Sequence, residues 1–225
     1  MTNIITSFND FKDSMPFQIS EYFSNKSYSD LSIQELAYIY LNVNWNHTTL
    51  KDKRISTSLY DLVENTRASY NNNRTRVYTP LLGSFILLDQ LGSIFSDPSN
   101  PSPNGIDIIL RLYGYDEKTI QYLIALRNGL MHDGSLISLA RPDRPKQYNT
   151  IFRLDPSLER TVNFAAVDWD GVFQESLNQY ISTINSKKFF DEVLDIISLC
   201  KDALLTNSLS LKITDKNEFF HKFLF

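Results

Sequence analysis

The chain has 225 residues, of which 42% are hydrophobic and 13% aromatic, and its formal net charge at neutral pH is −4. This length and apolar content suffice for one compact domain with a substantial core, and the acidic balance excludes a protein whose whole surface attracts nucleic acid. The sequence shows no N-terminal signal pattern and no apolar stretch of membrane-spanning length. We therefore expect a cytoplasmic protein that does not enter a membrane.

The main domain is predicted to span residues 31–206 and to follow an N-terminal segment of residues 1–30. Its first half is predicted to contain four helices, at about 32–43, 56–70, 80–95 and 105–113. Either Asp30 or Ser32 can cap the first of them, because both side chains can accept a hydrogen bond from a first helical turn. The third is apolar around most of its circumference, which is typical of the central helix of a bundle.

A fifth helix is predicted to begin at Asp116 and to carry a histidine near its end. Its apolar residues recur at three- and four-residue spacing and form one buried stripe, made of Ile120, Leu123, Ile124, Leu130 and Met131. Arg127 lies in line with this stripe, where its guanidinium loses hydration and needs a carboxylate, a carbonyl or a ligand phosphate. Asn128 lies one helical turn before His132. We therefore expect Arg127, Asn128 and His132 to share one cleft.

After this helix, the spacing of the apolar residues changes from helical to alternating. Ile151–Leu154 and Thr161–Ala165 flank a turn that contains Pro156, which predicts a β-hairpin in an insertion at about 147–168. A long helix is then predicted from Val172 toward Leu205, with a break near Ser186 as an alternative. The remaining residues, 207–225, form an aromatic tail with four phenylalanines, which we expect to dock on the domain or on a second subunit.

Several kinds of chemistry are excluded by the residues present. The seven glycines form no phosphate-binding loop, and three distant histidines with a single cysteine give no zinc spacing, so we expect neither a cofactor nor a metal site. The pairs Asp168 with Asp170 and Asp191 with Asp195 could hold a hard cation or act as acid and base. Such residues more often cap turns and helices or lie on a solvated helix face.

The string Arg127-Asn128-x-x-x-His132, on a late helix of a helical bundle, resembles the signature of the HEPN superfamily. That signature is an arginine, four to six residues and a histidine, usually with a polar residue after the arginine. The apolar helix at 80–95 and the long helix after the motif agree with it. The resemblance covers residues 31–139 and 172–206. It implies a mainly α fold: a HEPN-like helical bundle with a small β-hairpin insertion after the motif helix and a short C-terminal extension.

The resemblance also implies a metal-independent endoribonuclease, often a toxin or an antiphage defence effector, that acts as a homodimer whose paired motifs line one cleft. His132 would then act as general acid or base on the ribose 2′-hydroxyl and the leaving oxygen. Arg127 would stabilise the phosphate in the transition state. Asn128 would orient the imidazole or bind the phosphate. The expected product is a 2′,3′-cyclic phosphate.

The RNA contacts and the protein partner are less specified. A basic excess follows the motif, so Arg141, Arg144 and Lys146 are predicted to follow the RNA backbone, with a base stacked on Tyr148 or Tyr122. Some HEPN toxins carry a tyrosine two residues after the histidine, which their antitoxin nucleotidyltransferase modifies, whereas this chain has Gly134 there. An antitoxin of another kind or a different protein partner is left open.

Two other interpretations compete with the enzyme. The same fold can serve as a non-catalytic module that binds RNA or nucleotides or assembles with proteins. Alternatively, the chain is an unrelated helical protein in which His132 favourably meets the C-terminal end of a helix dipole. An enzyme predicts that Arg127 and His132 face an open cleft. A structural role predicts that Arg127 is paired with a buried acid such as Asp89.

Overall fold

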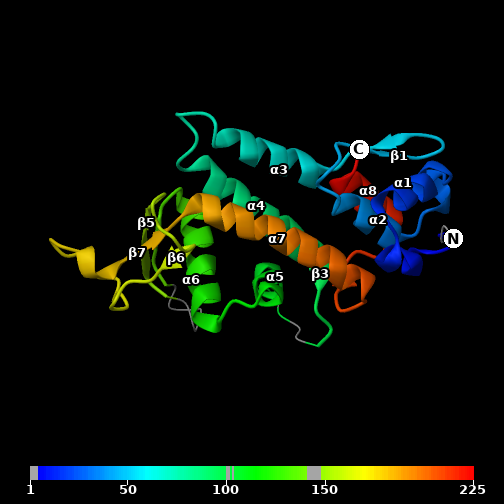
Figure 1. Ribbon diagram of the computed structural model, residues 1–225. Coiled ribbons are helices and arrows are strands. Elements are labelled where there is room, and N and C mark those ends of the chain that lie inside the picture. Colours follow the sequence, from blue (N-terminus) through cyan, green and yellow to red (C-terminus); the bar gives the residue numbers. More distant parts are fainter. Residues whose placement is uncertain (1–4, 100–101, 103, 141–147) are drawn as a thin grey trace.

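The computed structural model describes residues 5–99, 102, 104–140 and 148–225, and helices form most of its regular structure (Figure 1). The central helix is α4 (Thr79–Ile94), which packs against α3 (Ser58–Ser69), α5 (Gly105–Tyr113) and α7 (Ser186–Leu205). It buries residues on several sides, among them Leu81, Phe85, Leu88 and Leu91. The prediction of a mainly α protein with this helix at its centre is confirmed.

The helix ends follow local capping chemistry. The backbone N–H of Glu35 donates to Oγ of Ser32 at 3.2 Å, so Ser32 rather than Asp30 caps α2 (Ile33–Tyr40). This helix ends at Tyr40 and is therefore shorter than predicted. Gly114 ends α5 with a φ of +95°, a left-handed conformation that glycine adopts without steric cost. Three residues later the motif helix, α6 (Glu117–Asn128), begins.

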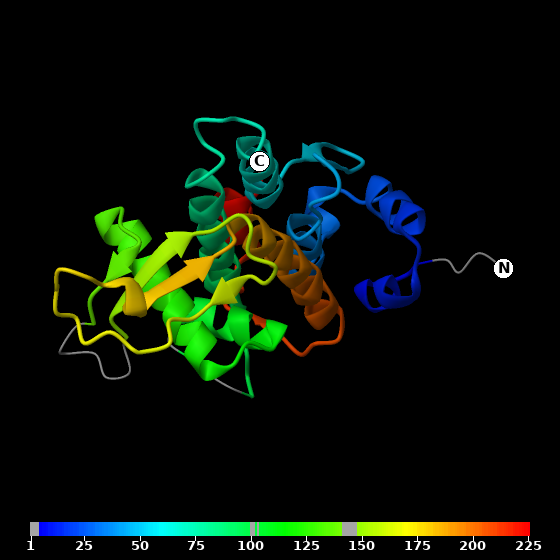
Figure 2. The ribbon, with the colours of Figure 1, turned by 60° about the vertical axis from the view of Figure 1, so that its left-hand side comes forward.

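A small sheet lies at one end of the molecule and corrects the predicted hairpin. Its strands are β4 (Ile137–Ser138), β5 (Thr150–Leu154), β6 (Val162–Asn163) and β7 (Ile181–Ile184), in the order β4-β5-β7-β6. Both strands of the predicted hairpin exist, but β7 lies between them, parallel to β5 and antiparallel to β6 (Figure 2). The hairpin prediction is wrong because the partner of each strand comes from a segment that was predicted as helix.

The predicted long helix is also too long. Residues 172–185 contain the 3-10 turn η4 (Asn178–Tyr180) and β7, and helix α7 begins only at Ser186. Oδ1 of Asn185 accepts the backbone N–H groups of Lys187 and Lys188 at 3.1 and 3.2 Å, which fixes the start of the helix. The helix boundary near Ser186 agrees with the alternative of a break there, but the segment before it is not α-helical in either form of the prediction. The β-branched residues of 181–184 gain more from pairing with β5 than from extending the helix.

The N-terminal segment and the C-terminal tail gather at the opposite end of the molecule (Figure 1). In the tail, β8 (Ser210–Leu211) pairs with β3 (Phe95–Ser96), and α8 (Lys216–Phe223) buries Phe219 completely. The tail thus docks on the body of the same chain. The remaining elements at this end are η1 (Phe8–Asp13), α1 (Pro16–Ser24), η2 (Tyr28–Asp30), β1 (Thr48–Thr49) and β2 (Arg54–Ile55). Within the described ranges, every helix is too short or too polar to cross a membrane.

Candidate functional site

The motif helix α6 is anchored before it reaches the motif. Asp116 caps it, because its carboxylate accepts the backbone N–H of Thr119 at 2.9 Å and the hydroxyl of the same residue at 3.0 Å. These hydrogen bonds hold the pKa of Asp116 below its usual value. Ile120, Leu123 and Leu126 are fully buried. The helix is therefore fixed in rotation, and this fixes the direction in which Arg127 leaves it.

Arg127 reaches from α6 to the central helix α4 and pairs with Asp89. Its Nε and Nη2 atoms both donate to Oδ2 of Asp89, at 3.0 and 2.8 Å, and Nη1 donates to Oδ1 of Asn128 at 3.1 Å. The side chain of Arg127 is 27% exposed and that of Asp89 is 33% exposed. A guanidinium has five N–H groups, so one on each terminal nitrogen remains after these three bonds. Asp89 is thus the predicted acid, but it is only partly buried.

The chain after Arg127 leaves α-helical geometry. Residues Gly129–Asp133 form a π turn, η3, which ends at Gly134 with a φ of +63°. A Cβ on Gly129 would lie 2.7 Å from the carbonyl oxygen of Ile137 and 2.8 Å from that of Ser135, so only glycine allows the chain to return this closely. Gly129 is therefore explained by close backbone packing, and Gly134 by its left-handed backbone conformation.

The end of this π turn is attached to the same helix that carries Asp89. The hydroxyl of Tyr78, at the start of α4, donates to the carbonyl oxygen of Gly134 at 2.6 Å. Burial raises the pKa of Tyr78, which keeps the hydroxyl protonated as a donor. Tyr78 carries no signal in the sequence, because its contact joins residues 56 positions apart and leaves no local pattern.

His132 lies on the π turn with its side chain exposed, and no hydrogen bond joins it to any described residue. Five residues of α-helix would turn it about 140° away from Arg127. A π turn winds less per residue than an α-helix, so this α-helical angle does not apply to His132. Asn128 bonds to Arg127 and not to His132. The expectation that Asn128 orients the imidazole is therefore not supported by the hydrogen bonds within the described ranges.

The predicted RNA contacts are only partly visible. Arg141, Arg144 and Lys146 lie outside the described residues. The ring of Tyr148 is half-buried and lies 4.9 Å from that of Tyr122. Tyr122 itself is only 3% exposed, which leaves Tyr148 as the base-stacking candidate of the two.

Three of the four carboxylates in the two predicted pairs, those of Asp168, Asp170 and Asp191, have structural partners. The hydroxyl of Tyr122 donates to Asp168 at 2.6 Å, and this hydrogen bond together with the one from Lys118 lowers the pKa of Asp168. Asp170 accepts the backbone N–H of Val172 in a turn, and Asp191 pairs with Lys187 on the surface of α7. Among the described side chains, no group of three or more His, Cys, Asp or Glu is arranged to hold a metal ion.

Comparison with known proteins gives no match: no family model, no curated protein and no solved structure is significantly similar to this chain.

Proposed function

We propose that this protein is a metal-independent endoribonuclease of HEPN type, with His132 as general acid or base and Arg127 as the group that stabilises the phosphate. The observation that carries the proposal is that one segment carries both a prepositioned guanidinium, on Arg127, and an exposed imidazole, on His132, that has no hydrogen-bond partner among the described residues. Arg127 keeps one N–H on each terminal nitrogen, and the neighbouring π turn presents His132 to solvent. Such π turns occur frequently at functional sites.

The chemistry uses Arg127, His132 and the ribose, together with a second imidazole from the partner copy of a homodimer. His132 removes the proton of the 2′-hydroxyl while the 2′ oxygen attacks the adjacent phosphorus. The two remaining N–H groups of Arg127 bind the non-bridging oxygens as negative charge builds on them. The 5′ oxygen leaves with a proton from a second imidazolium, which the paired motif of a homodimer supplies. The products are a 2′,3′-cyclic phosphate and a 5′-hydroxyl.

Asp89 and Asn128 act as positioning residues in this proposal. They hold three of the five guanidinium N–H groups, which limits the rotamer freedom that Arg127 loses when the remaining two bind a substrate. RNA is the proposed partner, together with a second copy of this chain and an antitoxin or other protein that limits its activity. We propose that it works in the cytoplasm, as a toxin or an antiphage defence effector.

A second candidate is a non-catalytic module of the same fold that binds RNA or nucleotides or assembles with other proteins. The ion pair between Arg127 and Asp89 favours it, because it satisfies the guanidinium without any substrate. The two candidates differ in one respect: the module needs Arg127 for stability and does not need His132 at all.

The test is cleavage of a labelled structured RNA by the purified protein in excess chelator, beside the variants His132→Ala, Arg127→Ala and His221→Ala. His221 is an exposed histidine on α8, and its replacement is the matched control. We expect wild type and His221→Ala to cut and to leave cyclic phosphate ends, and His132→Ala to cut about 100- to 10,000-fold more slowly. Equal cutting by all four proteins, or no cutting by any, would refute the proposal.

A further inference from the structure

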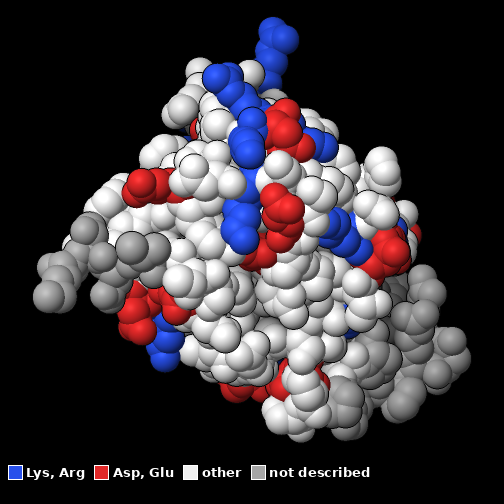
Figure 3. Space-filling view, turned by 90° about the vertical axis from the view of Figure 1, so that its right-hand side faces the viewer, with Lys and Arg blue, Asp and Glu red and all other residues white. Residues whose placement is uncertain are grey.

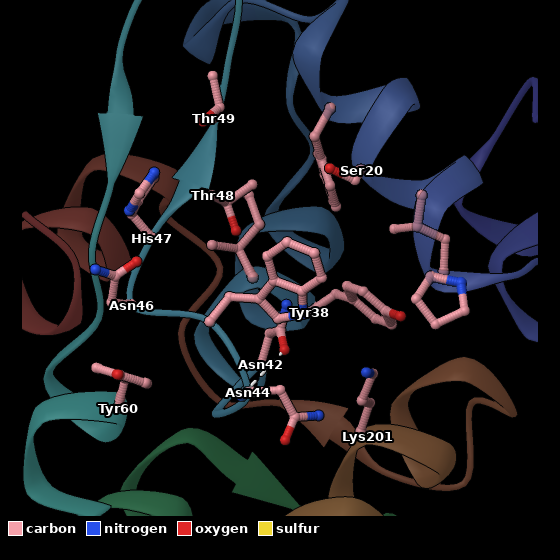
Figure 4. A pocket seen from close by; sticks show the side chains of 15 residues that line it. Ser20, Tyr38, Asn42, Asn44, Asn46, His47, Thr48, Thr49, Tyr60 and Lys201 are labelled. Carbon is pink, nitrogen blue, oxygen red and sulfur yellow. Dashed lines mark hydrogen bonds between the residues drawn. The ribbon is translucent and has the colours of Figure 1, made fainter. Parts of the chain in front are cut away.

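A cavity of about 540 Å³ lies at the end of the molecule that carries the N-terminal helices (Figure 4). Its walls come from α1, from α2 and the chain that follows it up to β1, from Tyr60 on α3 and from Lys201 on α7. This volume is within the range of small-molecule binding sites. None of its lining residues belongs to the group around Arg127, so any function of this cavity is separate from the proposed RNA cleavage site.

The first feature of the cavity is aromatic surface. Trp45 lines it and remains 54% exposed, although an indole is among the most costly side chains to leave in water. Tyr38 and Tyr60 line it as well. Burial raises the pKa of Tyr38 to about 12, so its hydroxyl stays protonated and the side chain is uncharged at physiological pH. These side chains offer a stacking face to a planar ligand.

The second feature is a set of neutral hydrogen-bonding groups. Three asparagines line the cavity, Asn42, Asn44 and Asn46, and each amide offers both donors and an acceptor. In Figure 4, Asn42 and Asn44 lie near the centre of the view, and a hydrogen bond of 3.4 Å joins the backbone N–H of Asn44 to Oδ1 of Asn42. Amide side chains of this kind recognise the edges of nucleobases, which also present donors and acceptors side by side.

The third feature is a lysine without an acidic partner. The ammonium group of Lys201 lies 4.5 Å from the centre of the Tyr38 ring, and neither an ion pair nor a hydrogen bond joins it to any described side chain. No Asp or Glu is among the described residues that line the cavity. The adjacent Asp202 raises the pKa of Lys201, but burial lowers it by more. A partly desolvated ammonium of this kind gains from a ligand anion.

The surface around this end carries charges of both signs. Figure 3 shows lysine and arginine side chains in the upper half of this face, with aspartate and glutamate side chains among them. Contacts tie several of them together: the backbone N–H of Lys51 donates to the carbonyl oxygen of Lys26 at 2.9 Å, and the ammonium groups of Lys53 and Lys216 lie over the ring of Tyr28. The group at this end that favours an anionic ligand is therefore Lys201, which lines the cavity.

We propose that this cavity binds a nucleotide, with its base stacked on Trp45, its base edge at the asparagine amides and its phosphate at Lys201. An aromatic base, a polar edge and one anionic group are the three elements that the lining complements. A sugar phosphate would use Lys201 and leave the aromatic surface unused. The nucleotide is either a free mononucleotide or an unpaired nucleotide of an RNA strand.

The test measures binding by the quenching of Trp45 fluorescence, since the protein's other tryptophan, Trp169, is buried and gives a constant background. The probes are the four ribonucleoside 5′-monophosphates, adenosine, ribose 5-phosphate and a single-stranded RNA pentamer. Calorimetry repeats the titrations for variants that lack the indole. The His132→Ala protein is used with the pentamer, so that binding is measured whether or not the proposed cleavage occurs.

We expect saturable binding of at least one monophosphate, weaker binding of adenosine and no detectable binding of ribose 5-phosphate. Trp45→Ala should lower the affinity by about 10- to 100-fold, the loss of one base stack. Lys201→Met should lower it about tenfold for the nucleotide and leave adenosine unchanged. Two exposed residues elsewhere provide matched controls, in Phe173→Ala and Lys188→Met, and neither should change the affinity.

The source of the nucleotide follows from the pentamer. Tighter binding of the pentamer than of any monophosphate indicates an RNA strand, and equal or weaker binding indicates a free nucleotide. The proposal is overturned if ribose 5-phosphate binds as tightly as the nucleotides. It is also overturned if Trp45→Ala binds like wild type while remaining folded by thermal unfolding, or if no probe saturates up to about 1 mM.

Discussion

The ion pair between Arg127 and Asp89 should contribute measurably to stability, because it joins the motif helix to the central helix. Both donating nitrogens contact one carboxylate oxygen, and the two side chains are 27% and 33% exposed. Fully exposed pairs contribute about 0 to 1 kcal/mol, and breaking a fully buried pair costs about 3–5 kcal/mol. We expect a coupling energy of about 1–2 kcal/mol, between these limits, in a double-mutant cycle of Asp89→Ala and Arg127→Ala.

The assay is urea unfolding of wild type, both single variants and the double variant. The matched control is the same cycle on Glu64 and Arg67, a pair on α3 whose side chains are 41% and 51% exposed. For this pair we expect no more than about 0.5 kcal/mol. A coupling energy at Asp89 and Arg127 no larger than that of the control would refute the conclusion that Asp89 holds the guanidinium in place.

Three further predictions concern the segments that position the site. Gly129→Ala should destabilise the protein by about 1–3 kcal/mol in thermal unfolding, because its Cβ would lie 2.7 Å from the Ile137 carbonyl oxygen, and unchanged stability would contradict the close approach. Asp116→Ala should cost about 0.5–2 kcal/mol at neutral pH. Because the pKa of Asp116 is lowered in the folded state, the loss of stability in this variant should be constant above about pH 5 and should shrink as the pH falls below about 4. The measurement is urea unfolding of both proteins at several pH values, and a loss of stability that does not shrink at low pH would contradict this prediction. Phe219→Ala should lower the free energy of unfolding by about 3–5 kcal/mol in urea, because its ring is fully buried. Phe225→Ala is the control: its ring is 59% exposed, and its loss should change the free energy of unfolding by less than about 0.5 kcal/mol. Equal effects of the two substitutions would show that the tail does not dock as described.

The sequence predicted most accurately the helices whose ends are determined by neighbouring residues in the chain. The helix at 105–113 has the predicted bounds, because Gly114 ends it with a left-handed conformation that requires no tertiary partner. The central helix at 80–95 differs by one residue at each end, since Thr79 begins it and Ile94 ends it. Its apolar circumference already implied neighbours on several sides, and the structure supplies them.

The sheet shows where local patterns stop being sufficient. The alternation at 151–154 and 161–165 predicted strands, and strands are present at 150–154 and 162–163. Strand partners cannot be derived from alternation, because hydrogen bonding joins segments that are distant in sequence. Here β7 (Ile181–Ile184) lies between the two strands. Because a helix follows β7 closely in sequence, the apolar spacing across both elements was ambiguous between strand and helix.

In the candidate site, too, some features follow from local sequence patterns and others from tertiary contacts. The sequence alone determined that Arg127 is an anomaly in an apolar stripe, that Asp89 is an available partner and that His132 follows at a suggestive spacing, because helical periodicity is a local property. Tertiary structure decided the π turn, the anchor from Tyr78 and the cavity at Trp45 and Lys201. The anchor and the cavity depend on the close approach of chain segments that lie far apart in sequence, and the free energy of such contacts comes from packing that no local pattern records. The π turn depends on the close return of the chain from Gly129 to Ser135 and Ile137, which helical periodicity does not predict either.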